Sequence, residues 1–126
     1  MRTVRNYGRQ AALVSIIGLC LGLPYAISAE VAGQQTDEVA LGKEIAFDRV
    51  RGNCLACHLI DDGELPGYIA PPLIAMKQRF PDPAVLRAQI WDATERNSES
   101  VMPPYGRHKI LTEDEIDLIV TYLYTL

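Results

Sequence analysis

Cys54-Leu55-Ala56-Cys57-His58 is the stretch of sequence that decides the fold of this chain. A Cys-x-x-Cys-His box is the pattern by which a c-type haem is attached to a protein. Its two thiols can form thioether bonds with the haem vinyl groups, and the adjacent imidazole then falls under the iron as proximal ligand. We therefore expect one covalent haem c, anchored by Cys54 and Cys57 and ligated by His58.

The box has two rival interpretations. A redox disulfide between the two cysteines would be typical of a thioredoxin-like βαβ context, which the sequence does not offer. A zinc site would need four ligands, and His108 is the only other histidine in the chain. Both rivals account for less of the sequence than a haem does.

Residues 1–29 have the layout of a secretory signal peptide. Three arginines precede an apolar run at residues 11–23, and residues 27–29 offer a small-residue cleavage site. We expect cleavage to leave residues 30–126 as one haem-bearing domain with no stable membrane insertion. The alternative is an uncleaved anchor helix, although the apolar run is shorter than the ~20 residues that span a bilayer.

The charge of residues 30–126 limits the possible partners. Removing the three leader arginines leaves nine basic residues against 16 acidic ones, a formal charge of −7. Such a surface repels phosphate backbones, so no nucleic-acid partner is expected. Cys20 would leave with the leader, so residues 30–126 keep no cysteine outside the box.

Helical patterns cover most of the rest. Residues 37–50 carry apolar side chains at helical spacing, and Gly42 within them predicts a close approach by another helix. Asp82 is the expected N-cap of a helix over residues 83–96, after which helical spacing stops. A capping box beginning at Thr112 predicts a final helix that runs to the C-terminus.

No segment alternates with period two, so the predicted fold class is all-α: a few helices and long loops wrapped around one haem. Residues 30–36 are expected to be a polar, poorly ordered lead-in. Residues 61–72 and 97–109 have the composition of irregular loops. Loops this long are unusual in a compact domain unless they wrap a prosthetic group.

Met102 is the favoured sixth ligand of the iron. It lies far enough beyond His58 for the chain to reach the opposite haem face, and Pro103-Pro104 stiffen the loop behind it. Met76 is expected to pack as core or haem-edge cover, and His108 to lie on the surface. Either of these, or an open position, remains an alternative. Six-coordinate iron favours electron transfer over peroxidase or oxygen chemistry.

Two further side chains have expected places. A ligating imidazole normally gives its second N–H to an oxygen acceptor, and Pro71 is the candidate carbonyl for His58. A plain turn proline is the competing interpretation. Trp91 is expected to be a core residue, with packing beside a haem propionate as the alternative.

The order is helix, box, a loop that ends in Pro71-Pro72 (residues 61–72, the proline loop), helix, a loop that contains Met102 (residues 97–109, the methionine loop) and a final helix. This order resembles the class I cytochrome c fold. That resemblance implies that the first and last helices cross, which would bring Gly42 and Phe47 near Tyr122. Several blocks are more closely similar to the SoxX family of sulfur-oxidation cytochromes. They are Gly52 to His58, Ala70 to Lys77, Leu86 to Asp92, Val101 to His108, and Leu111-Thr112 with Glu115-Ile116.

The SoxX resemblance implies a periplasmic subunit that forms a heterodimer with a SoxA-type dihaem cytochrome. By this resemblance, the pair would be an L-cysteine S-thiosulfotransferase, which joins thiosulfate oxidatively to a cysteine of the SoxYZ carrier. The sulfur-handling thiol then belongs to the partner, so no catalytic residue is expected on this chain. Its haem would pass electrons to an acceptor cytochrome. The alternative is an autonomous monohaem electron shuttle.

Overall fold

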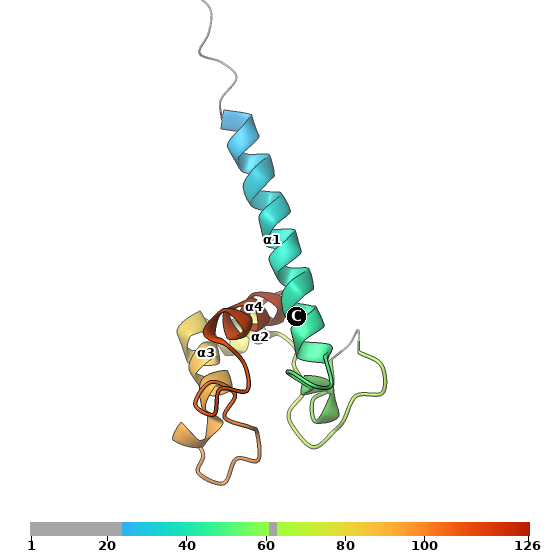
Figure 1. Ribbon diagram of the computed structural model, residues 1–126, viewed down its shortest axis with the longest axis vertical. Coiled ribbons are helices and arrows are strands. Elements are labelled where there is room, and N and C mark those ends of the chain that lie inside the picture. Colours follow the sequence, from blue (N-terminus) through green and yellow to red (C-terminus); the bar gives the residue numbers. More distant parts are fainter. Residues whose placement is uncertain (1–23, 61–62) are drawn as a thin grey trace, which may run out of the picture.

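The computed structural model describes residues 24–60 and 63–126, and it describes side chains from residue 33 onward. Helices and loops make up all of this part of the chain. The elements are α1 (Pro24–Phe47), η1 (Cys54–Ala56), α2 (Met76–Arg79), α3 (Pro83–Trp91), η2 (Ala93–Glu95) and α4 (Glu113–Leu123) (Figure 1). No strand occurs within these two ranges. The predicted all-α class is confirmed.

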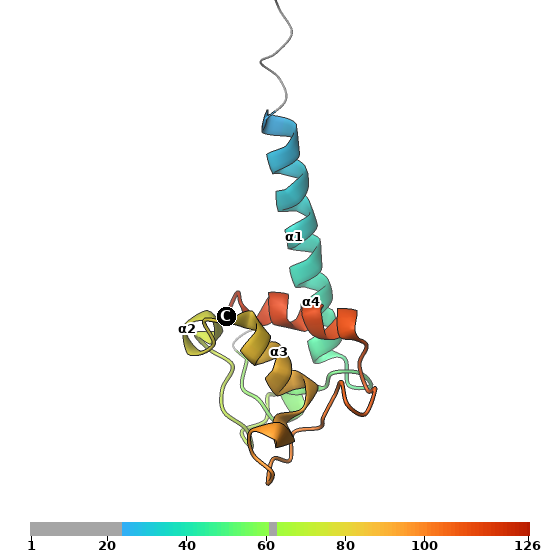
Figure 2. The same cartoon turned by 90° about the vertical axis from the view of Figure 1, so that its left-hand side faces the viewer.

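Helix α1 is longer than the sequence pattern predicted. It begins at Pro24, and the expectation that residues 30–36 form a poorly ordered lead-in was wrong. Proline suits a first helical position, and the alanine, glutamate and glutamine that follow it are strong helix formers. The N-terminal part of α1 extends away from the rest of the chain (Figures 1 and 2).

The C-terminal end of α1 comes at Phe47, three residues before the predicted end at Val50. The carboxylate of Asp48 accepts a hydrogen bond from the Val50 N–H at 2.8 Å. The carbonyl oxygen of Asp48 accepts from the Asn53 N–H at 2.8 Å. These bonds turn the chain out of the helix and directly into the cysteine box.

Helices α1 and α4 cross in close contact, as the class I resemblance implied. A Cβ added at Gly42 would lie 2.0 Å from the carbonyl oxygen of Leu118, so only glycine allows this approach. The rings of Phe47 and Tyr122 meet edge to face, with centroids 6.0 Å apart and planes at 84°. The predicted contacts of Gly42 and Phe47 with α4 are confirmed.

The hydrophobic core lies beneath this crossing. Ile45 and Ala46 from α1 meet Ile116 and Ile119 from α4, and all four side chains are buried. The core continues along α4 and into α2, α3 and the loops. Its further members are Val120, Tyr122 and Leu123 in α4, and Ile60, Leu73, Met76, Leu86, Ile90, Tyr105 and Leu111 elsewhere.

Both predicted helix starts are confirmed. Asp82 caps α3 by accepting from the Ala84 N–H at 2.9 Å. Thr112 and Glu115 form the capping box of α4, in which each side chain bonds the backbone N–H of the other.

Helix α3 ends at Trp91, short of the predicted residue 96. The backbone of Asp92 is extended, and its carboxylate accepts from the Thr94 N–H at 3.0 Å. That bond caps η2 and replaces the continuation of α3. Within the ranges that can be described, none of the helices combines the length and the apolar character needed to cross a bilayer.

Candidate functional site

The cysteine box is folded into one tight turn, η1. Asn53 enters the turn in the left-handed conformation, with φ at 49°. The N–H groups of Cys57 and His58 then donate to the carbonyl oxygen of Cys54 at 3.2 and 2.9 Å. The turn brings Cys54, Cys57 and His58 into the lining of one cavity, and both thiols are free of disulfide bonds.

The segment after the box runs back alongside it. The N–H of Gly67 donates to the carbonyl of Leu55 at 2.7 Å, and the N–H of Ala70 donates to that of Cys57 at 3.0 Å. A Cβ on Gly67 would lie 2.1 Å from the carbonyl oxygen of Ala56, so the absence of a side chain allows this approach. These two hydrogen bonds hold the loop against the box as far as Ala70, the residue before Pro71-Pro72.

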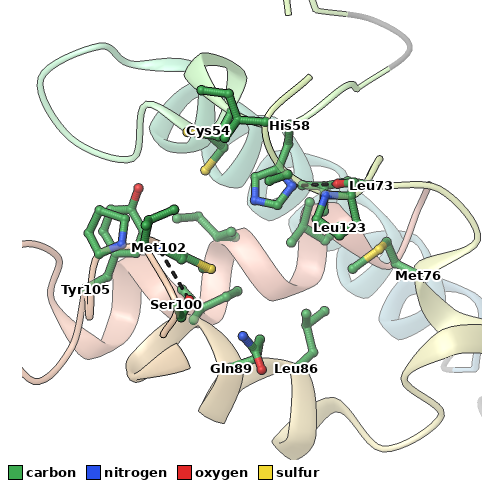
Figure 3. A pocket seen from close by; sticks show the side chains of 18 of the residues that line it. Cys54, His58, Leu73, Met76, Leu86, Gln89, Ser100, Met102, Tyr105 and Leu123 are labelled. Atoms are coloured by element: carbon green, nitrogen blue, oxygen red, sulfur yellow. Dashed lines mark hydrogen bonds between the residues drawn. The ribbon is translucent and has the colours of Figure 1, made fainter. Parts of the chain in front are cut away.

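This arrangement fixes the orientation of the His58 ring. Nδ1 of His58 lies 2.7 Å from the carbonyl oxygen of Pro71, as the sequence predicted (Figure 3). A carbonyl can only accept, so Nδ1 carries the proton and donates. The lone pair of Nε2 is then available to a metal ion.

The cavity beside His58 has a volume of about 450 Å³. That size lies within the ~300–1,000 Å³ typical of ligand and cofactor pockets. Its lining is mainly apolar and comes from the box, the proline loop, α2, α3, the methionine loop and α4. Among the lining residues are Ile69, Leu73, Phe80, Leu86, Ile90, Val101, Leu111, Ile119 and Leu123. Leu73, Leu86 and Leu123 are labelled in Figure 3.

Two methionines line this cavity. Met102 comes from the loop between η2 and α4 and is partly exposed, with its N–H 3.3 Å from the Ser100 hydroxyl oxygen that accepts from it. Met76 is the first residue of α2 and is only 1% exposed. Its sulfur lies 3.5 Å from Nη1 of Arg79 and accepts a hydrogen bond from it. Met76 therefore packs as core, as predicted.

The third candidate for the sixth ligand lies elsewhere. His108 is exposed and is not among the residues that line the cavity. Its place on the surface agrees with the prediction. A zinc site would have required His108 to lie beside Cys54 and Cys57, but His108 does not line the cavity that these cysteines line.

Two titratable groups that line the cavity, the Cys54 thiol and the Tyr105 phenol, have raised pKa values. Burial raises the pKa of the Cys54 thiol to about 11. Burial, and after it the neighbouring Cys54 and Cys57, raises the pKa of the Tyr105 phenol to about 12. Both groups therefore stay protonated at neutral pH. A protonated thiol supplies both the sulfur and the hydrogen that add across a vinyl group when a thioether forms.

Sequence reasoning missed the role of Tyr105. Its side chain is 8% exposed, and its hydroxyl donates to the carbonyl oxygen of Gly52 at 2.5 Å. The hydrogen bond joins two residues that are 53 positions apart in the sequence, so no local sequence pattern predicts it. Trp91 is not among the cavity-lining residues; its ring packs on Gly106, where a Cβ would lie 2.0 Å from Cε3.

Comparison with known proteins identifies the family. Residues 39–126 match the family model of cytochrome c. The chain belongs to the cytochrome c family. The match begins within α1 and includes the box, the proline loop, the methionine loop and α4, so the fold is that of a class I cytochrome c.

A curated relative of this cytochrome is an uncharacterized lipoprotein of Aquifex aeolicus (strain VF5). The two are 35% identical over 75 residues, which is 59% of the cytochrome and 36% of the relative. The chain therefore spans little more than a third of the length of this relative.

The residues of the cavity fit the cofactor of the family, a covalently bound haem c. Cys54 and Cys57 match the thioether anchors of the cytochrome c box, and His58 presents an oriented imidazole beside them. The cavity is large and apolar, as a porphyrin requires. The chain has one such box, which fits one haem.

Proposed function

We propose that this cytochrome is a one-electron carrier whose iron is held by His58 and Met102, and that it is the SoxX-type subunit of a thiosulfate-conjugating enzyme. The observation that carries the electron-transfer role is the convergence of the cysteine box, His58 and Met102 on one cavity. The bound haem supplies the reversible one-electron chemistry of its iron. An iron with two protein ligands offers no vacant position to a substrate.

Met102 is favoured over Met76 as the distal ligand by the surroundings of the two sulfurs. The Met76 sulfur already accepts a hydrogen bond from Arg79, and the residue is locked into the core at the start of α2. Met102 lies in a loop beside Pro103 and Pro104, which fix φ and lack N–H donors. A thioether in that stiff loop can meet the iron without disturbing a helix.

Residues of this chain would hold the haem in place and orient its proximal ligand. Cys54 and Cys57 tether the porphyrin, which fixes its position relative to η1. The carbonyl of Pro71 holds the His58 ring and increases the basicity of the ligating nitrogen. Apolar side chains exclude water from the cavity, and a methionine ligand favours reduced iron, which raises the potential.

We further propose that residues 1–29 are removed on export and that residues 30–126 work in the periplasm. The basic, apolar and small-residue order of the leader supports this. The description of the Aquifex relative as a lipoprotein is consistent with the same side of the membrane. Residues 1–23, including Cys20, lie outside the described residues; cleavage after Ala29 would keep the part of α1 that packs on α4.

The sulfur chemistry requires a thiol on another protein. Joining thiosulfate to a carrier cysteine breaks its S–H bond, forms an S–S bond and releases one proton and two electrons. In the described part of this cytochrome the free thiols are Cys54 and Cys57, and both are committed to the haem. The SoxA-type partner is therefore expected to handle sulfur. This haem would accept the electrons one at a time and pass each to an acceptor cytochrome.

Co-expression with the SoxA-type dihaem subunit tests the assignment. The two chains are expected to elute together in size-exclusion chromatography, with three haems per complex, and each chain run alone is the control. Thiosulfate and the SoxYZ carrier should then reduce the haem of this chain. Separate elution, with rapid electron exchange only on transient encounter, would instead support an autonomous shuttle.

A further inference from the structure

The buried phenol of Tyr105 links the methionine loop to the cysteine box. Its hydroxyl donates to the carbonyl oxygen of Gly52 at 2.5 Å. Gly52 lies two residues before Cys54, and Tyr105 lies three residues after Met102. The hydrogen bond therefore connects the segment that leads into the cysteine box with the segment that carries Met102, and both segments line the cavity.

The box end of this link is rigid. The N–H of Gly52 donates to the carbonyl of Ile45 at 3.1 Å, which attaches the residue to the last turns of α1. A Cβ on Gly52 would lie 2.6 Å from that same carbonyl oxygen, so the backbone is packed directly against the helix. The acceptor of the phenol is consequently fixed relative to α1 and to η1.

The methionine end of the link is rigid as well. Only Pro103 and Pro104 separate Met102 from Tyr105, and both have a fixed φ. Beyond Tyr105, the N–H of Gly106 donates to the carbonyl of Trp91 at 3.1 Å, which attaches this end of the loop to α3. A displacement of Tyr105 is thus passed to Met102 with little loss.

We propose that Tyr105 is a positioning residue for the distal ligand: its hydrogen bond to Gly52 holds the Met102 thioether at bonding distance from the iron. This inference rests on the proposed ligation by Met102. Because the bond is buried and joins two stiff segments, breaking it shifts the equilibrium between methionine-bound and methionine-free iron. A role in general stability alone would leave that equilibrium unchanged.

Tyr124 supplies a matched control. Its hydroxyl donates to the carbonyl oxygen of Phe80, so Tyr124→Phe removes the same kind of bond as Tyr105→Phe. Tyr124 follows α4 and does not belong to the methionine loop. The two variants therefore lose one phenol-to-carbonyl bond each, and only one of them loosens the segment of Met102.

The experiment is an imidazole titration of the ferric holoprotein, followed by the weak long-wavelength band that marks a methionine thioether on ferric haem. Tyr105→Phe is expected to increase the apparent affinity for imidazole about five- to tenfold, the equilibrium worth of one buried hydrogen bond. Tyr124→Phe should change it by less than about twofold, although both variants lower the denaturant midpoint. Equal effects of the two variants, or no effect of either, would overturn the proposal.

A reciprocal measurement keeps the proposal testable if Tyr105→Phe matures poorly. By linkage, loss of the methionine–iron bond must weaken the phenol bond by the same factor. In Met102→Ala, NMR should therefore show faster exchange of the Tyr105 hydroxyl proton and unchanged exchange of the Tyr124 proton. Unchanged exchange at Tyr105 would refute the link. A wild-type protein that lacks the methionine band would instead refute Met102 as ligand, and this proposal with it.

Discussion

Nη1 of Arg107 lies 2.7 Å from Oδ2 of Asp92, an ion pair that joins the end of the methionine loop to the residue between α3 and η2. The side chain of Asp92 is almost fully buried, at 2% exposure, whereas that of Arg107 is half exposed. Oδ2 has no well-aligned hydrogen bond of its own, so the charge of Arg107 is what offsets the burial of this oxygen. Oδ1 accepts from the hydroxyl of Thr94 at 2.5 Å.

This environment predicts a loss of stability in acid. The Thr94 hydrogen bonds, followed by the charge of Arg107, hold the pKa of Asp92 below its ordinary value of 3.8. A lowered pKa in the folded state stabilises the protein above 3.8, and that contribution is lost as the pH falls toward the folded-state value. Asp92→Asn keeps the cap on Thr94 but removes the charge, so the variant should lose less stability between about pH 4 and pH 2.

Urea midpoints measured across that range would check the prediction for Asp92. The expected result is a flatter profile for Asp92→Asn than for the wild type. Parallel profiles would mean that Asp92 does not titrate differently in the folded and unfolded states. Asp48 and Glu115 also have lowered pKa values, but both are present and titrate in both proteins, so their contributions cancel from the comparison.

The distal ligand can be identified by a pair of methionine variants. Met102→Ala should abolish the thioether band of ferric haem and lower the midpoint potential, because a methionine ligand favours reduced iron. Met76→Leu keeps a similar apolar volume in the core and loses only the weak contact of the sulfur with Arg79, so it should retain the band and cost less than about 1.5 kcal/mol of stability. A band that survives in Met102→Ala and disappears in Met76→Leu would reverse the assignment.

The helix crossing can be tested by adding a single methyl group. Gly42→Ala would force the new Cβ against the Leu118 carbonyl, and we expect it to lower the free energy of unfolding by about 2–3 kcal/mol. Gly33 offers the control within the same helix, since a Cβ there meets nothing within 4 Å. Gly33→Ala should be neutral or stabilise by up to about 1 kcal/mol. Similar denaturant midpoints for both variants would contradict the close packing.

The capping box of α4 has a measurable contribution of its own. Thr112→Ala removes the oxygen that accepts from the Glu115 N–H at 3.2 Å, and should cost about 1 kcal/mol of stability. Thr121→Ala, in the last turn of the same helix, should cost less, because alanine has the higher helix propensity. Chemical denaturation of both variants makes the comparison. A larger loss at Thr121 would mean that the cap is not what holds the start of α4.

Local patterns in the sequence predicted a large part of this structure. The caps at Asp82 and Thr112 were recognised because each depends on residues at most three positions apart. Gly42 was recognised as a contact point because glycine destabilises the interior of a helix, so its presence there indicates a close approach by another element. Pro71 was found as the partner of His58 because a ligating histidine requires a second acceptor.

What the sequence did not reveal depends on contacts distant along the chain or on competing local signals. The polarity of residues 30–36 suggested a disordered lead-in, although the alanine, glutamate and glutamines among them are good helix formers. The short helix α2 follows Ala75 in a left-handed conformation, which alanine rarely adopts and no pattern announces. The bond from Tyr105 to Gly52 required the fold itself.

The contact at Gly42 also determines how the haem site can come apart. Helices α1 and α4 cross at Gly42, and both proposed iron ligands lie in the sequence between these helices. The crossing therefore brings the two ends of the haem-binding segment together and closes it around the cavity. Separating the helices would open that segment and free the methionine loop in the same motion. Detachment of the distal ligand and undocking of the terminal helices should therefore share a rate constant on heating.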